Sequence, residues 1–311
     1  MDKIYSQGLN KDALKRWTKD YDIPIKIYEE PYFSYLVQLY KGYFKTVERL
    51  DLLKNTMVDF ENDDKFLTHN NSLTEKIVET ITGLESYKEF INMKMDKFNI
   101  TSSYPKNDIY KQINTGKMFV SIDLVKANYQ ALKYVNPEIV LNTENYNEFI
   151  SEFTQYDYIK ESKYIRQVIF GRMNPKRQIK VARYLIELVT NFLLENKMIE
   201  ETQIAMVSTD EIVFEVSDES AKEFAKSYVE ITKQIKEVLN INVDIEVFEL
   251  KLLAERYYVK EFINKPGYQF ACVPQIYFPQ VFKKYHGLDI DEKDLVFKYE
   301  HQLAKFLNPV V

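Results

Sequence analysis

Apolar and aromatic positions recur at helical spacing through the first hundred residues of the chain. Over residues 32–55 they return every three or four positions, which predicts an amphipathic helix. A polar stretch at residues 59–71 predicts a loop. The run Asn-Ser-Leu-Thr-Glu that begins at Asn71 is typical of a helix start, so a second helix is expected over residues 73–95.

After residue 99 the pattern changes to short β-favouring runs separated by helical segments. Turn chemistry at residues 102–108 precedes a strand that ends at Asp123. Further along, the pattern predicts helices at 125–134, 143–169, 176–195 and 217–239, a hairpin centred on Asp210, a half-buried strand at 242–250 and a last short helix near 295–307. A small antiparallel sheet with helices packed on one face, an α+β fold, is the predicted architecture.

This reading divides the chain into three segments. Residues 1–100 form a helical N-terminal region, residues 101–264 carry the predicted sheet, and residues 265–311 are a C-terminal extension.

Acidic residues stand at the ends of two predicted strands. Asp210 and Glu211 interrupt an apolar, β-branched run from Met206 to Val216, and Asp123 closes the run that starts at Met118. Two strands that each deliver an aspartate are the minimum for a two-metal phosphoryl-transfer site. Aspartate is also common at turns and caps, so a purely structural role is the alternative.

Composition narrows the choice of metal and of compartment. One cysteine and three histidines in 311 residues argue against a disulfide and against a structural zinc site. A metal would be held by carboxylates, which favours Mg²⁺ or Mn²⁺. Apolar runs of membrane-spanning length and a signal-peptide core are both lacking. We therefore expect a cytoplasmic protein with no membrane partner.

Basic residues gather around the start of the helix predicted at 176–195. They are Arg172, Lys176, Arg177, Lys180 and Arg183. Lys176, Lys180 and Arg183 share one helix face and would suit phosphate contacts, although a solvated face is the alternative. Lys126, one turn after Asp123, would reach a phosphate or pair with an acid. Since the net charge is −5, binding of nucleic acid would need such a local basic surface.

The acidic hairpin and its neighbours resemble the palm of family A, DNA polymerase I-like, polymerases. Residues 207–216 are similar to that family's second metal motif, with Thr209 in place of a histidine, and Ser121-Ile122-Asp123 is similar to the first. The resemblance covers residues 101–262. It implies that Asp123 and Asp210 ligate metal, that Glu211 lies close to it, and that the basic helix approaches nucleic acid.

The chain departs from that family where the fingers subdomain would be. The interval between Asp123 and Arg172 is too short for fingers, and Asn128 and Gln130 replace a glutamate and an arginine of the family. Residues 1–100 take a thumb-like position in the order of segments. The resemblance therefore implies a palm without fingers, encoded by a phage or another mobile element, and located in the host cytoplasm if the source is viral.

Three functions follow as hypotheses. The first is a Mg²⁺-dependent nucleotidyltransferase of limited or untemplated activity, with Asp123, Asp210 and Glu211 at the catalytic site. The second is an inactive, polymerase-derived subunit that binds nucleic acid and replication or transcription proteins. The third is a metal-dependent nuclease that uses the same acids.

Overall fold

The computed structural model describes residues 4–311 and divides them into two compact units, each discontinuous in sequence. The first contains the chain up to Thr80, Asn147–Met173 and Val273–Val311, and the second contains Ile81–Tyr146 and Asn174–Cys272. Helix α4, Asp63–Gly83, and helix α7, Tyr146–Ser151, each contribute residues to both units. Every strand of the predicted sheet lies in the second unit.

The first unit is built mainly from helices. They are α1 (Lys11–Asp20), α2 (Tyr32–Leu39), α3 (Thr46–Met57), α8 (Asp157–Glu161), α9 (Lys163–Gly171) and α12 (Phe278–Tyr285), joined by the hairpin β7 (Val296–Tyr299) and β8 (Gln302–Lys305). Aromatic side chains fill its core: the ring of Tyr40 packs edge-on against Phe278 and Phe282, with centroids 5.5 Å apart in both pairs. Such contacts stabilise the unit beyond simple burial of area.

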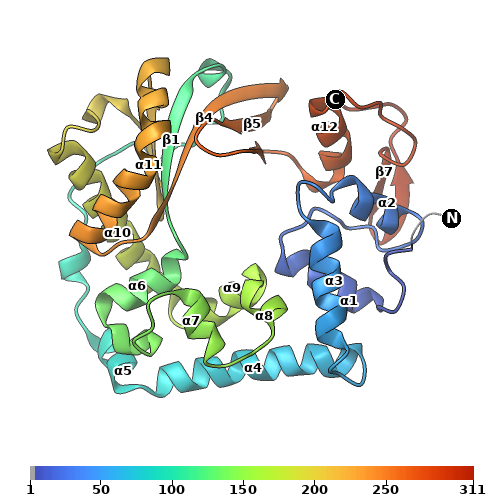
Figure 1. Ribbon diagram of the computed structural model, residues 1–311, viewed down its shortest axis with the longest axis horizontal. Helices are drawn as coiled ribbons and strands as arrows, with labels where there is room; N and C mark the ends of the chain where they lie inside the picture. Colours follow the sequence, from blue (N-terminus) through green and yellow to red (C-terminus); the bar gives the residue numbers. More distant parts are fainter. Residues whose placement is uncertain (1–3) are drawn as a thin grey trace. The chain divides into compact units, whose positions relative to one another are not determined.

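A six-stranded antiparallel sheet forms the centre of the second unit (Figure 1). Its strands are β1 (Met118–Leu124), β2 (Ile204–Val207), β3 (Glu211–Val216), β4 (Val243–Ala254), β5 (Tyr257–Phe262) and β6 (Tyr268–Ala271), in the order β2-β3-β1-β4-β5-β6. The helices of this unit are α5 (Glu85–Asn92), α6 (Ala127–Val135), α10 (Pro175–Glu195) and α11 (Asp218–Leu239). The first four strands have the βαββαβ connectivity of ferredoxin-like folds.

One face of this sheet is apolar and covered by helices. α11 contacts β1 and β4, and α10 contacts β3 and α11, so both helices lie on the same face (Figure 1). Alternate strand residues are fully buried there, and Phe214 packs edge-on against Phe224 of α11 with centroids 5.4 Å apart. The α+β architecture with helices on one face of an antiparallel sheet is therefore confirmed.

The opposite face of the sheet is divided in two. Ile109, Phe119, Val213, Phe248 and Leu250 belong to an apolar cluster on one part of it. The other part carries the acidic residues described below. A buried apolar cluster thus lies beside a polar edge on this face. A polar ligand could approach the sheet only at that edge.

Most of the helices and strands predicted after residue 99 are present. The helix expected at 176–195 is α10, and the hairpin around Asp210 is the antiparallel pair β2–β3. The helix expected from residue 217 is α11, where the hydroxyl of Ser217 accepts the amide of Ser220 as an N-cap. Strands β5 and β6 were not predicted.

Three predictions for the ends of the chain are wrong. The helix expected over 32–55 is broken after α2, because Lys45 takes a left-handed φ of 50° before α3. Residues 63–71 are helical rather than a loop, since the Oδ1 of Asn62 accepts the amide of Lys65 at 3.0 Å and starts α4 there. Residues 296–305 form the β7–β8 hairpin in place of a helix, because Glu300 and His301 both have positive φ, as a two-residue hairpin turn requires.

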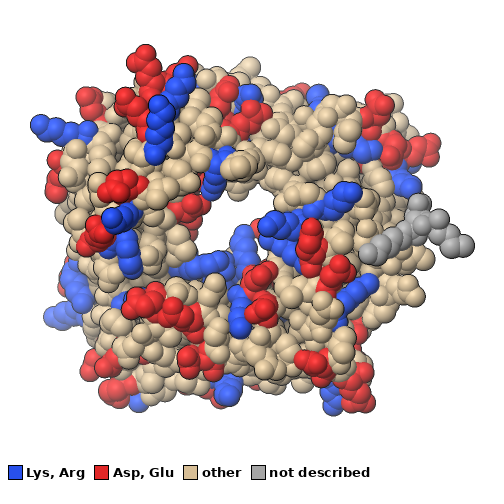
Figure 2. Space-filling view, viewed as in Figure 1, with Lys and Arg blue, Asp and Glu red and all other residues tan. Residues whose placement is uncertain are grey.

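No helix within residues 4–311 has the length and apolar character needed to cross a membrane. On the face shown in Figure 2, acidic and basic side chains are interspersed, so neither sign of charge covers that whole face.

Candidate acidic site and its basic groove

Asp123 and Asp210 are brought together by the pairing of β1 with β3. Asp123 is the Cα partner of Glu211 in this antiparallel pair. The amide of Leu124 donates a hydrogen bond of 2.8 Å to the carbonyl of Asp210, which ties the turn of the β2–β3 hairpin to the end of β1. The two strands therefore deliver their aspartates to the same edge of the sheet.

Two further carboxylates come from β4, on the other side of β1. Asp244 is the Cα partner of Asp123, and Glu246 is the partner of Ser121. Directly opposed residues of an antiparallel pair project from the same face. Asp123, Asp210, Glu211, Asp244 and Glu246, here called the acidic cluster, therefore share one polar edge.

Two lysines neutralise part of the acidic cluster. The ammonium of Lys260 on β5 lies 3.7 Å from Glu211 Oε1 and 3.4 Å from Glu246 Oε2. Lys260 is 5% exposed, and its ammonium also lies 4.7 Å from the centre of the Phe248 ring. Lys265 contacts Asp244 Oδ2 and Glu246 Oε1, each at 3.1 Å. Three of the five acids are thus already paired.

Neither aspartate has a cationic partner within residues 4–311, because Lys260 and Lys265 pair with the other three acids. Glu211 accepts a hydrogen bond of 2.5 Å from the hydroxyl of Ser121, whereas no hydrogen-bond or ion-pair partner of the Asp123 carboxylate lies within residues 4–311. The Asp123 side chain is solvent-exposed, yet desolvation by the surrounding protein, followed by repulsion from Asp210 and Glu211, raises the pKa of its carboxyl to about 7. Burial and Glu211 likewise raise the pKa of Asp210, against a hydrogen bond from Ser208.

The acidic cluster fits a divalent cation only in part. Among the described residues, no three His, Cys, Asp or Glu side chains are arranged to hold a metal by themselves. Mg²⁺ commonly uses one or two carboxylates and completes its shell with water and substrate phosphates. Asp123 and Asp210 have no lysine or arginine partner in the described part of the chain, so their carboxylates, once deprotonated, are the ones that could hold the ion.

A basic groove runs along α10 and continues to the hairpin turn. Its wider part, about 500 Å³, is lined by Lys176, Lys180 and Arg183 on one side and by residues 98–100 on the other. A narrower continuation is lined by Ile100, Ser102, Tyr104, Lys106, Arg183, Glu187, Val207 and Ser208, so it holds one carboxylate beside two basic side chains. The groove ends at Ser208, whose side chain hydrogen-bonds to Asp210, so its end lies beside the hairpin turn that carries this aspartate.

The other predicted basic residues are not in this groove. The guanidinium of Arg177 donates to the carbonyl of Met93 and lies 5.3 Å from the Phe90 ring centre, so it supports the packing of α5. Arg172 caps the end of α9 and belongs to the first unit. Lys126 is exposed at the start of α6, where its φ of 54° is left-handed.

Sequence reasoning missed Asp244, Glu246, Lys260 and Lys265. The strand pattern at 242–250 did show polar residues alternating with apolar ones, which places Asp244 and Glu246 on one face. Their position beside Asp123 depends on the order of strands in the sheet. Nothing in the sequence pattern indicated Lys260 as a site residue, since its strand, β5, was not predicted.

Comparisons with protein-family models, curated proteins and solved structures find no match to this chain.

Proposed function

We propose that this chain is a metal-dependent nucleotidyltransferase that extends a nucleic-acid strand, with Asp123 and Asp210 at its centre. The observation that carries this proposal is the convergence of these two unpaired aspartates at adjacent ends of β1 and the β2–β3 hairpin. The βαββαβ order of the strands adds support, because it agrees with the palm resemblance of residues 101–262.

In this reaction the 3′-oxygen of the strand bonds to the α-phosphorus of a nucleoside triphosphate. The bond from that phosphorus to the departing pyrophosphate breaks, and the hydroxyl proton passes to solvent. A bound Mg²⁺ or Mn²⁺ would supply charge neutralisation for the phosphates. Asp123 and Asp210 would hold the ion, while Ser121 and Lys260 keep Glu211 turned to the protein.

The basic groove offers a path for the strand. Lys176, Lys180 and Arg183 line its wide part, and Lys106 lies on the continuation toward Ser208. Lysine and arginine contacts to phosphate position a strand without reading its sequence. The groove is thus suited to hold the phosphates of a strand whose 3′ end reaches Asp210.

An extension assay tests the proposal. The full chain is incubated with a labelled oligonucleotide, each NTP and dNTP, and Mg²⁺ or Mn²⁺, and compared with Asp123→Asn, Asp210→Asn and the control Asp289→Asn. Asp289 is exposed and lies in the first unit, so its variant should extend the strand as the wild type does. Extension that is lost only in the two site variants supports the proposal.

Two results would overturn it. Strand shortening that depends on Asp123 and Asp210 would indicate a nuclease. Absence of any reaction, together with unchanged metal and oligonucleotide binding in Asp210→Asn, would remove the catalytic role.

A second candidate function is an inactive subunit that binds nucleic acid and assembles with replication or transcription proteins. The pairing of Lys260 and Lys265 with three of the five acids favours it, because less charge is left to attract cations. Oligonucleotide binding that is independent of divalent ions, with no turnover of any nucleotide, would select this alternative.

A further inference from the structure

One pocket in the first unit is lined mainly by lysines. Five lysines contribute to it: Lys11, Lys15 and Lys19 of α1, Lys26 of the following loop, and Lys298 of β7. Tyr28, Glu300 and His301 complete the lining, and the volume is about 600 Å³. All of these residues belong to the first unit, so the pocket, here called the lysine pocket, does not depend on the second.

Three of the lysines form a straight row on α1. Lys11, Lys15 and Lys19 are four residues apart, which places them on one helix face at intervals of about 6 Å. The row therefore extends over about 12 Å. A single phosphate would engage only one end of such a row, whereas an extended polyanion would engage all of it.

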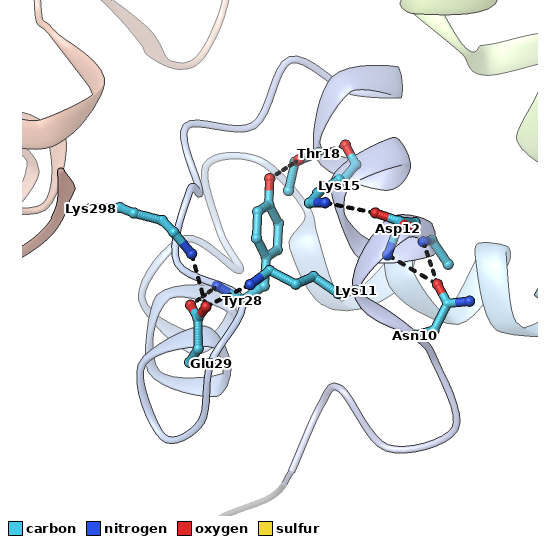
Figure 3. A network of polar contacts seen from close by, with 9 residues as sticks. Asn10, Lys11, Asp12, Lys15, Thr18, Tyr28, Glu29 and Lys298 are labelled. Carbon is cyan, nitrogen blue, oxygen red and sulfur yellow. Dashed lines mark hydrogen bonds and ion pairs between the residues drawn. The ribbon is translucent and has the colours of Figure 1, made fainter. Parts of the chain in front are cut away.

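Acidic side chains neutralise only part of this charge. Glu29 lies between Lys11 and Lys298, at 2.7 Å and 2.8 Å from their ammonium groups, and Lys15 pairs with Asp12 at 2.6 Å (Figure 3). Burial would raise the pKa of Glu29, but the hydrogen bonds from Lys11 and Lys298 outweigh it and lower the pKa to about 2. Glu29 is therefore ionised and holds these two lysines in place.

Lys19 and Lys26 have no carboxylate partner within residues 4–311. Both are exposed, and Lys19 lies 5.5 Å from the ring centre of Tyr164. The five lysines are opposed by three carboxylates, those of Glu29, Asp12 and Glu300, so the pocket keeps a local positive excess in a chain with a net charge of −5. The ring of Tyr28 forms part of the wall, since its hydroxyl is held by Thr18 at 2.9 Å (Figure 3).

We propose that the lysine pocket binds the phosphate backbone of a nucleic-acid strand, separately from the acidic site. Lysines act as point charges on flexible stems, so they suit backbone contacts without sequence preference, and the aromatic wall would accept a base. The choice of nucleic acid over another polyanion rests on the proposed function. The site itself rests only on the geometry of the first unit.

Charge reversal of the two unpaired lysines tests this proposal. Binding of a labelled single-stranded oligonucleotide to the full chain is measured over a series of salt concentrations, without nucleotide or divalent ions. Lys19→Glu/Lys26→Glu should weaken binding about tenfold or more at low salt and reduce the slope of log K against log salt by about 1 for each phosphate that the variant no longer neutralises. The control Lys222→Glu/Lys226→Glu, an exposed i, i+4 pair on α11, should change binding far less.

A second variant is expected to change oligonucleotide affinity in the opposite direction. Glu29→Gln removes the acid between Lys11 and Lys298 and should strengthen binding several-fold, a gain that loss of folding would not produce. Affinity that is unchanged in the Lys19/Lys26 variant, or that falls equally in the α11 control, would overturn the proposal. So would inorganic triphosphate that binds more tightly than the oligonucleotide at equal total phosphate concentration, because the site would then favour a free phosphate ligand.

The two proposals fail separately. If the wild type extends no strand but Lys19→Glu/Lys26→Glu still weakens oligonucleotide binding, the nucleotidyltransferase is excluded and the lysine pocket stands. If extension requires Asp210 while the lysine variant binds normally, only the pocket is excluded.

Discussion

Asp123 and Glu211 are opposed across the β1–β3 pair, yet their carboxylates have different surroundings. Glu211 accepts the hydroxyl of Ser121 and lies 3.7 Å from the ammonium of Lys260. Asp123 faces other acids, and its pKa is raised to about 7. The protein thus neutralises the carboxylate of Glu211. The carboxylate of Asp123 is left to be neutralised by a ligand or a proton.

The first prediction concerns pH. Because the pKa of Asp123 is higher in the folded chain than its ordinary value of 3.8, the folded state binds the proton more tightly. The contribution of Asp123 to the free energy of unfolding is therefore greatest below pH of about 3.8. It falls as the pH rises toward about 7 and stays low at higher pH. Asp123→Asn should stabilise the metal-free chain above pH of about 7 by about 1 kcal/mol, since solvent screens part of the repulsion.

Urea unfolding in EDTA at a series of pH values measures this difference between variant and wild type. A stability difference that does not change between pH of about 4 and about 8 would show that Asp123 titrates at its ordinary value.

The second prediction concerns divalent ions. If Asp123 and Asp210 hold the ion, Mg²⁺ or Mn²⁺ should raise the Tm of the wild type. The stabilisation should reach about 2.7 kcal/mol at one hundred times the Kd. The same titration should leave the Tm of Asp123→Asn and Asp210→Asn unchanged, while Asp289→Asn should respond as the wild type does. An equal response of all four proteins would place the ion elsewhere.

The third prediction concerns the buried ammonium of Lys260. Lys260→Met keeps the apolar stem over Phe248 but leaves Glu211 and Glu246 without this partner. Loss of one member of a buried pair is costly, and we expect a decrease of about 2 kcal/mol in the free energy of unfolding, because both acids retain some exposure. Lys251→Met is the matched control on the preceding strand. Lys251 and its partner Glu261 are both partly exposed, so the expected change is below about 1 kcal/mol.

Equal effects of Lys260→Met and Lys251→Met in urea unfolding would contradict this account. Such a result would mean that the acidic cluster does not depend on its buried lysine.

The fourth prediction concerns Gln130, which joins the segment after β1 to the segment before β4. Its Nε2 donates to the carbonyls of Val125 and Asn242, both at 2.6 Å, and its Oε1 accepts the amide of Asn242 at 2.7 Å. Gln130→Ala would remove these bonds from the Val125 carbonyl and the Asn242 amide in a part-buried place, while the Asn242 carbonyl keeps the Val125 amide at 3.0 Å, and should cost about 2 kcal/mol. Gln234→Ala, which removes an exposed bond to Glu230 on α11, should cost less than about 0.5 kcal/mol.

Thermal unfolding of both glutamine variants checks this prediction. Removal of three hydrogen bonds without a decrease in stability in Gln130→Ala would show that water replaces the side chain at this junction.

The sequence by itself determined the elements around the candidate site. α10 and α11 carry long amphipathic patterns with start signals at Asn174 and Ser217, and β1 and the β2–β3 hairpin carry β-branched runs that end at acids. These signals are local, since helix periodicity and capping depend on residues a few positions apart. The pairing of Asp123 with the Asp210 turn was expected from the palm resemblance.

Only the tertiary structure decided what surrounds those acids. Asp244 and Glu246 stand beside Asp123 because β4 pairs with the other edge of β1, and Lys260 reaches Glu211 because β5 adds to β4. The lysine pocket likewise joins α1 to β7, which lie almost three hundred residues apart in the chain. Strand order and contacts between distant segments are set by the packing of the whole unit. They therefore cannot be predicted from the spacing of residues along the chain.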